Sequence, residues 1–346
     1  MTSSLNERKR QILFAVINDY ITSALPVGSK TIFENYKLEL SPATIRSVMA
    51  DLEEMGLLFH PHTSAGRVPT PEGFKYYAES FLQIKGVTSA DKKVIEQRFR
   101  KQKEHIENIM KETSNILSSI SSYAGIVLAP DKPKSIFKHL HFIKLREKRL
   151  LAVLVTKSGM IQNKIIETDE DISQDELDKI HNYLNSVMHG LSLRKVKENI
   201  LKEMQKDKNS YDRLVAKAIS LGHQAVESMD AEEPLIFLDG EANLLDQPEF
   251  SDTTKIKSVL KALQRKTLLV ELLEKTASAE GIQIFIGTEA GHPEMKDLSI
   301  ISSRYVSDDG VLGILGIIGP TRMNYPKVIP LVDFTAKFIS KLLTDE

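Results

Sequence analysis

The segment from Ser41 to Thr70 restricts the possible folds of this chain more than any other part of the sequence. Ser41-Pro42 is a typical helix start, because serine caps free amides and proline fits the first helical position. Gly56 ends this helix. Apolar residues recur along it at helical spacing: Ile45, Val48, Met49, Leu52 and Met55. A short apolar strand, a polar turn-rich loop and a returning strand follow, which predicts a helix with an adjoining β-hairpin, the wing of a winged helix-turn-helix domain.

The residues before this segment predict the other helices of such a domain. Residues 5–22 predict a helix with Asn6 as its N-cap. The run Leu25-Pro26-Val27-Gly28 ends that helix, because proline lacks the amide hydrogen that a helix interior needs. Ser29 is expected to cap a second, short helix before the tight connection to Ser41. Two short helices, a tight turn and a capped third helix form the outline of a helix-turn-helix.

The second face of the helix that begins at Ser41 indicates what it binds. It carries small residues and one arginine: Ala43, Arg46, Ser47 and Ala50. Small residues let a helix enter the major groove of DNA, where arginine and serine can read base edges. We expect Arg46 and Ser47 to meet base edges and Thr44 to lie near the entrance of the groove. Further polar residues are expected to hold the DNA backbone: Ser29, Lys30, Thr31, Thr63, Ser64 and Arg67.

A small three-helix domain with a polar loop is the alternative interpretation of the N-terminal segment. The first 85 residues hold nine basic and nine acidic side chains, and the whole chain of 346 residues has a net charge of −1. A nucleic-acid site must therefore be local, because no general basic coat exists to attract phosphates.

Composition argues against several other classes of function. The absence of cysteine removes disulfides, thiolate nucleophiles and Cys-ligated metals, and it fits a cytoplasmic protein. The longest apolar tract, 310–320, is far shorter than the ~20 residues of a membrane span, so no membrane partner is expected. Its glycines, spaced three apart, predict a closely packed buried strand. No nucleophile elbow, phosphate-binding loop or zinc-protease motif occurs, so we expect no enzyme, no cofactor and no metal site.

The pattern after residue 86 predicts an α+β domain that a second domain interrupts. A helix is expected over 91–121, strands between 126 and 167, helices between 173 and 229, a further helix over 255–279, and strands again between 282 and 318. Strands, a helical stretch and strands again are typical of one domain inserted into another. The expected division is a DNA-binding domain at 1–86, a discontinuous domain at 88–168 and 258–346, and a mostly helical insert at 169–257.

Specific motifs lie near both ends of the chain. They are Leu5-Asn6-Glu7-Arg8, Asp19-Tyr20-Ile21, Pro26-Val27-Gly28-Ser29, Leu40-Ser41-Pro42-Ala43-Thr44-Ile45-Arg46, Asp51-Leu52-Glu53, His62-Thr63-Ser64-Ala65-Gly66-Arg67-Val68-Pro69 and Ile318-Gly319-Pro320-Thr321-Arg322-Met323-Asn324-Tyr325. Together these motifs resemble the HrcA family of bacterial heat-inducible transcription repressors. The resemblance implies that the discontinuous domain is GAF-like and that the insert is a dimerisation domain.

The same resemblance implies a function. It implies a negative transcriptional regulator of chaperonin and DnaK-type heat-shock operons, which binds double-stranded DNA at the CIRCE inverted repeat as a homodimer. It also implies that the GroEL chaperonin keeps the repressor active. Two alternatives stay open. One is a transcription regulator that senses a small molecule through its GAF-like domain, and the other is an enzyme built on residues 126–346, which would need a polar pocket.

Overall fold

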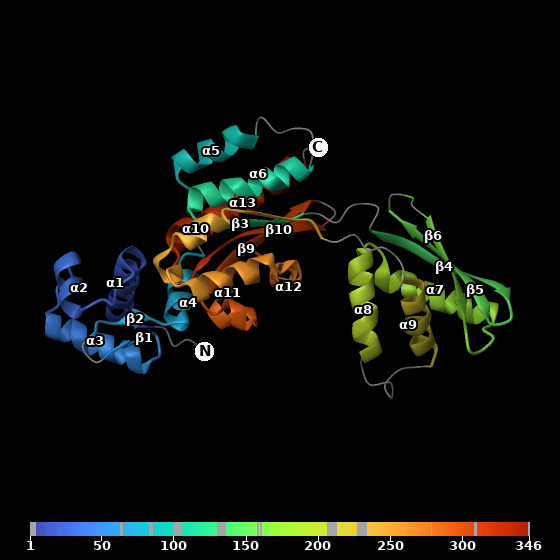
Figure 1. Cartoon of the computed structure of the whole chain (residues 1–346), viewed down its shortest axis with the longest axis horizontal. Helices are drawn as coiled ribbons and strands as arrows, with labels where there is room; N and C mark the ends of the chain where they lie inside the picture. The colour runs from blue at the N-terminus through green and yellow to red at the C-terminus, as the bar shows by residue number, and fades with distance from the viewer. Residues whose placement is uncertain are drawn as a thin grey trace. The chain divides into compact units, whose positions relative to one another are not determined.

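A computed structural model describes residues 5–62, 65–82, 86–99, 106–129, 136–157, 159, 161–205, 213–226, 234–277, 279–307 and 310–344. The chain is an α+β protein whose contacts divide it into two compact units, residues 1–129 with 236–346 and residues 130–235 (Figure 1). No helix within the described ranges has the length and apolar character that crossing a membrane requires.

The first unit begins with the helices and the hairpin that the sequence predicts. The elements are α1 Glu7–Ser23, α2 Ser29–Asn35, α3 Pro42–Glu54, β1 Leu58–Phe59, β2 Val68–Pro69 and α4 Pro71–Glu79. β1 and β2 pair antiparallel, with Leu58 opposite Pro69 and Phe59 opposite Val68. The hairpin therefore follows α3 directly, in the order that the sequence indicates.

Local capping explains where these helices begin. Asn6 caps α1 and Ser41 caps α3, each through a side-chain oxygen that accepts the amide hydrogen three residues ahead. The N-cap expected at Ser29 is wrong, because α2 already includes Ser29 and Gly28 occupies the cap position without a side-chain bond.

A five-stranded antiparallel sheet forms the centre of the first unit, in the order β7-β3-β10-β9-β8. Helices α6 and α13 cover one face of this sheet, and α11 and α12 cover the other (Figure 1). The elements are α5 Ser89–Phe99, α6 Ile106–Ser121, β3 Ala124–Leu128, β7 Ile236–Asp239, α10 Glu241–Leu245, η3 Pro248–Phe250, α11 Thr253–Gln264, α12 Lys266–Ala277, β8 Gln283–Ile286, η4 Gly287–Ala290, η5 Pro293–Met295, β9 Leu298–Ser307, β10 Gly310–Pro320 and α13 Tyr325–Thr344.

Two glycines let neighbouring segments approach the central strands closely. A Cβ atom on Gly125 in β3 would lie 2.1 Å from the carbonyl oxygen of Ser114 in α6. A Cβ atom on Gly313 in β10 would lie 2.4 Å from the carbonyl oxygen of Leu128. Both distances are shorter than any real contact, so a side chain at either position would force the backbone apart. This agrees with the closely packed buried strand predicted for 310–320.

Two helices that the sequence predicts as continuous differ in the structure. The helix expected over 91–121 is described as α5 and α6, and residues 100–105 lie outside the described ranges. The helix expected from Lys255 to Ala279 is divided between α11 and α12, because Arg265 has a non-helical backbone conformation with φ −82° and ψ 86°. Apolar periodicity continues across this break, so the pattern alone could not reveal it.

The second unit combines a three-stranded antiparallel sheet with three helices. The sheet order is β4-β5-β6. The elements are β4 Phe137–Arg146, β5 Arg149–Thr156, β6 Ile161–Glu167, α7 Gln174–Met188, α8 Leu193–Gln205 and α9 Arg213–Val226. One face of the sheet packs on the helices, as in the shared core of Leu140, Phe142 and Leu154 with Leu177 and Ile180.

These units differ from the expected division of the chain. The strands between 136 and 167 were assigned to the discontinuous domain, and 169–257 to a mostly helical insert. The structure groups those strands with α7–α9, because the inner sheet face supplies about a third of the buried residues in their common core, and it groups 236–257 with the central sheet. The second unit therefore begins earlier, ends earlier and contains a sheet.

Gly125→Ala is expected to lower the free energy of unfolding by ~1–3 kcal/mol, because the new methyl group would push α6 away from β3. Urea denaturation measures this change. Gly222→Ala in α9 is the matched control, since the nearest atoms there are movable side-chain carbons at 3.2 Å or more. That variant should be no less stable than the original chain, because alanine favours a helix over glycine. Equal unfolding midpoints for Gly125→Ala and the original chain would contradict the close packing.

Candidate nucleic-acid interface

Helix α3 has one buried and one exposed face. Its buried residues form the core of the N-terminal segment: Ile45, Val48, Met49 and Leu52. Arg46 and Ser47 are exposed on the other face, and Thr44 is half-buried beside them. Arg46 makes no hydrogen bond or ion pair with any described residue. The structure therefore brings together the three residues that the sequence assigned to the groove, and it leaves the arginine free to meet a ligand.

The first turn of α3 is fixed by a short hydrogen-bonded cluster. The Ser41 hydroxyl accepts the Thr44 amide at 3.2 Å, and the two hydroxyl oxygens lie 3.0 Å apart. The positive end of the helix dipole and the exposed Arg46 side chain therefore lie in the same half of α3, which is the geometry that attracts an anion such as a phosphate.

The acidic residues of α3 lie in its second half, and two of them are neutralised. Asp51 pairs with Lys9 of α1 at 2.9 Å, and Glu53 pairs with Arg67 at 2.9 Å. These pairs remove negative charge from the surface that would approach DNA. The sequence does not identify Lys9 and Glu53 as partners in these ion pairs, because a count of charges does not show which charged side chains lie close together.

The residues expected from α2 lie in its first turn. Lys30 is 84% exposed and pairs only loosely with Glu34, at 3.7 Å one helical turn ahead. Thr31 is exposed and Ser29 is half-buried. Such a lysine keeps most of its freedom and can extend to a phosphate.

Arg67, which the sequence assigns to the DNA backbone, also makes contacts within the N-terminal segment. Its side chain is 14% exposed, and its guanidinium pairs with Glu53 of α3, which also lies 2.8 Å from Nδ1 of His60. Its backbone forms a bridge with Val27, with N–O distances of 2.8 and 2.9 Å. Arg67 thus holds the base of the hairpin against α3. Thr63 and Ser64, the other hairpin residues that are expected to hold the DNA backbone, lie outside the described residues.

The link between α1 and α2 is also polar. Tyr36 Oη donates to one carboxylate oxygen of Asp19 at 3.1 Å, and Asn35 donates to the other at 3.1 Å. Burial and the nearby Asp19 charge raise the pKa of Tyr36 to about 12, so the phenol stays a donor at any physiological pH. This pair orients α2, and with it Lys30, relative to α1.

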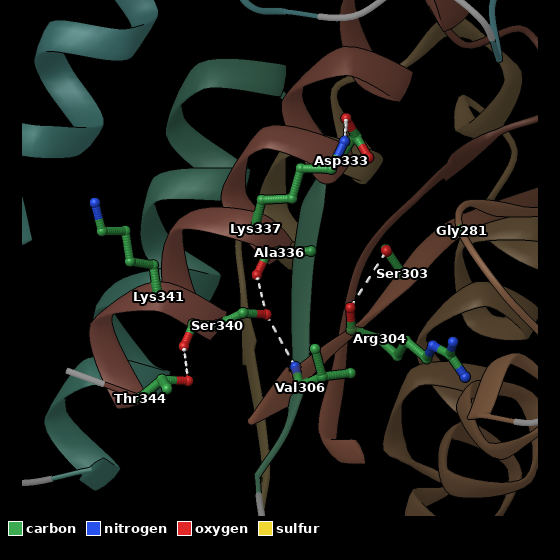
Figure 2. Close-up of a pocket in the computed structure, with 10 residues that line it drawn as sticks. All are labelled: Gly281, Ser303, Arg304, Val306, Asp333, Ala336, Lys337, Ser340, Lys341 and Thr344. Carbon is green, nitrogen blue, oxygen red and sulfur yellow. Dashed lines mark hydrogen bonds and ion pairs between the residues drawn. The ribbon is translucent and has the colours of Figure 1, made fainter. Parts of the chain in front are cut away.

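A hollow between β9 and α13 is a second candidate site. It measures about 530 Å³ and is lined by Gly281, Ser303, Arg304, Val306, Asp333, Ala336, Lys337, Ser340, Lys341 and Thr344. Figure 2 shows Lys337 bonded to Asp333, the Ser340 hydroxyl accepting the Val306 amide, and Lys341 pointing away from Arg304. Asp333, Lys337 and Ser340 are bonded to their neighbours and Arg304 donates to Glu280, so these polar groups do not converge on a common centre. The first half of α3 is therefore the stronger candidate.

Comparison with known proteins shows similarity to one family of transcription repressors over nearly the whole chain. Residues 107–329 match the model described as the HrcA protein C terminal domain. The chain is 45% identical to the heat-inducible transcription repressor HrcA of Geobacter sulfurreducens, over 99% of this chain and 100% of that protein. It is 39% identical to the repressor of the same name from Syntrophobacter fumaroxidans, over 99% of each chain.

One solved structure shares the fold over nearly its full length. A crystal structure of a hypothetical protein at 2.2 Å resolution aligns with 99% of this chain and 99% of its own, with a TM-score of 0.63 and 22% identity. At that identity the likeness concerns the fold alone.

Proposed function

The chain belongs to the HrcA family of heat-inducible transcription repressors, and we propose that it represses chaperonin and DnaK-type operons by binding the CIRCE inverted repeat as a homodimer. As a member of this family the chain is a negative regulator of heat-shock genes and not an enzyme. Its operators lie on the bacterial chromosome, so the proposal places the chain in the cytoplasm.

The exposure of the first half of α3, with Arg46 on its surface, is the observation that best supports DNA binding. We assign residues 7–79, from α1 to α4 with β1 and β2, to a winged helix-turn-helix, and we name them the head. In this assignment α3 enters the major groove, where Arg46 and Ser47 read base edges and Thr44 lies at the groove entrance. Polar side chains of α2 and of the wing would hold the backbone: Ser29, Lys30, Thr31, Thr63 and Ser64. Arg67 would also hold the DNA backbone, and its pair with Glu53 would position the wing.

The outer face of the β4-β5-β6 sheet supports the homodimer. Its apolar residues lie in register across the strands, with Ile143 opposite Leu151 and Leu151 opposite Ile165. Ile143, Ile161 and Ile165 are 49%, 64% and 52% exposed. An apolar patch of this kind typically marks an interaction site. An inverted repeat has two-fold symmetry, so a second copy of the chain is the occupant that the operator requires.

We further propose that GroEL keeps this repressor active. The outer sheet face is apolar and exposed in a single copy, which makes it a surface that a chaperonin can hold until a second copy covers it. Repression depends on the fraction of the protein that is a DNA-competent dimer. A chaperonin that raises this fraction would therefore raise repression. In the same proposal the five-stranded sheet with helices on both faces is the GAF-like domain.

Arg46→Ala is expected to weaken operator binding by ~1–3 kcal/mol and to relax specificity at one base pair, because it removes a contact to a base edge.

Lys30→Ala should weaken binding to all sequences alike and should reduce the slope of log K against log salt by about one, because it removes a contact to a phosphate. A salt-titrated binding assay measures both effects on the CIRCE repeat, on its single-base variants and on a scrambled duplex. An equal loss for Arg46→Ala on every duplex would contradict a base-reading role.

The double variant Ile143→Asp with Ile165→Asp is expected to be monomeric, because it places charge in the apolar face that we assign to the dimer. Light scattering after size-exclusion chromatography measures the mass. Val187→Asp on α7 is the control, since Val187 is 53% exposed and lies outside this face. That variant should keep the oligomeric state of the original chain. A double variant that stays folded and dimeric would show that the interface lies elsewhere.

A further inference from the structure

The segment 321–324, between β10 and α13, contains a buried cation that DNA reading by α3 does not explain. Arg322 is only 8% exposed. Its Nε and Nη2 donate to the Glu249 carboxylate, with 3.2 Å between Nη2 and Oε2, and its Nη1 donates to the carbonyl oxygen of Ile21. Glu249 lies in η3 beside the central sheet, whereas Ile21 lies in the last turn of α1 in the head. One side chain therefore joins the head to the central sheet.

The chemistry of this contact suits arginine in particular. The carbonyl groups in the last turn of a helix have no partner within the helix, and they form the negative end of its dipole. Arginine can donate to a carboxylate through one edge of its planar group and to a carbonyl through another nitrogen. Lysine offers a single point charge and could not hold both Glu249 and Ile21 in the same way.

Contacts from α4 join the head to the same region. Lys75 donates to the Ile284 carbonyl at 2.5 Å and lies 3.2 Å from a carboxylate oxygen of Glu289. The rings of Phe74 and Tyr77 lie 6.0 and 6.4 Å from the ring of Tyr325, the first residue of α13. The head is thus attached at two places, α1 and α4.

The segment that carries Arg322 is itself held in place. Tyr325 Oη donates to the Thr321 carbonyl at 2.7 Å, and the Asn324 amide donates to Tyr123 Oη at 3.2 Å. Tyr325 and Met323 are fully buried. Arg322 therefore projects from a fixed turn, and breaking its pair would leave a charge without compensation in a buried site.

From these contacts we infer that Arg322 is a positioning residue, which sets the orientation of the head and so the spacing of half-sites that a dimer can bind. This inference rests on the proposed function. Two α3 helices can enter successive major grooves only if each head is held in one orientation, since half-sites repeat at about 34 Å per turn. A loosely attached head would still read one half-site, but it would lose the gain from binding two at once.

The test compares duplexes that differ only in geometry. They are the CIRCE repeat, one half-site alone, and repeats whose spacer is changed by about five base pairs, or half a helical turn. The variant is Arg322→Met with Glu249→Gln, which removes both charges and leaves neither unpaired. We expect this full-length variant to bind the native repeat about 10- to 100-fold more weakly and the half-site as well as the original chain does. The difference in affinity between spacers should also shrink.

The control is Arg265→Met with Glu294→Gln, which removes a more exposed Arg–Glu ion pair, 2.5 Å long, whose two residues both lie outside the head. It should bind all duplexes as the original chain does. If the main variant unfolds by circular dichroism, Arg322→Lys gives the same comparison with the charge kept. A folded, dimeric variant that still discriminates spacers fully, or that loses half-site affinity equally, would overturn the inference. An original chain that cannot distinguish the repeat from scrambled DNA would overturn the proposed function itself.

Discussion

Burial of one face of α3 is the interaction on which the arrangement of the head depends. Ile45 and Leu52 have no exposed surface, so the helix cannot rotate without exposing its apolar stripe to water. The pairs Lys9–Asp51 and Arg67–Glu53 lie beside that core and fix α1 and the hairpin against the same helix. Because these contacts occupy one side and the second half of α3, the exposed side of its first half remains available with Arg46.

The same division between a packed and an exposed side occurs in the second unit. Strands alternate their side chains, so Phe142 and Leu154 pack on the helices while Ile143 and Ile165 face outward. A shift of one residue in register would reverse the two faces. Such a shift is unfavourable because it would expose the residues of the inner core to water. The proposed DNA contact and the proposed dimer contact therefore each use the exposed side of an element whose other side is buried. This makes both surfaces rigid, which favours binding because little conformational freedom is lost.

Most local features were predictable from the sequence, although the Ser29 cap and the break at Arg265 were not, and long-range features were not predictable. The caps at Asn6 and Ser41 and the hairpin after α3 depend on residues close in sequence. The domain limits depend instead on which sheet each strand joins, and periodicity does not encode this. The pattern therefore places 136–167 in the discontinuous domain, whereas these strands form a separate sheet. The pair between Arg67 and Glu53 joins two elements, so the sequence pattern does not reveal it. The motif around Arg322 identified the family, but its contact with Ile21 spans 301 residues and has no local signal.

The central claim is that the chain is a repressor whose dimer recognises an inverted repeat with help from the chaperonin. The most direct test is a salt-titrated binding measurement with the full-length chain on the CIRCE repeat and on a scrambled duplex, each with and without GroEL. The account predicts tight binding to the repeat only, strengthened by GroEL, and a weak salt-dependent background on scrambled DNA. Equal and weak binding to both duplexes under all conditions would contradict it.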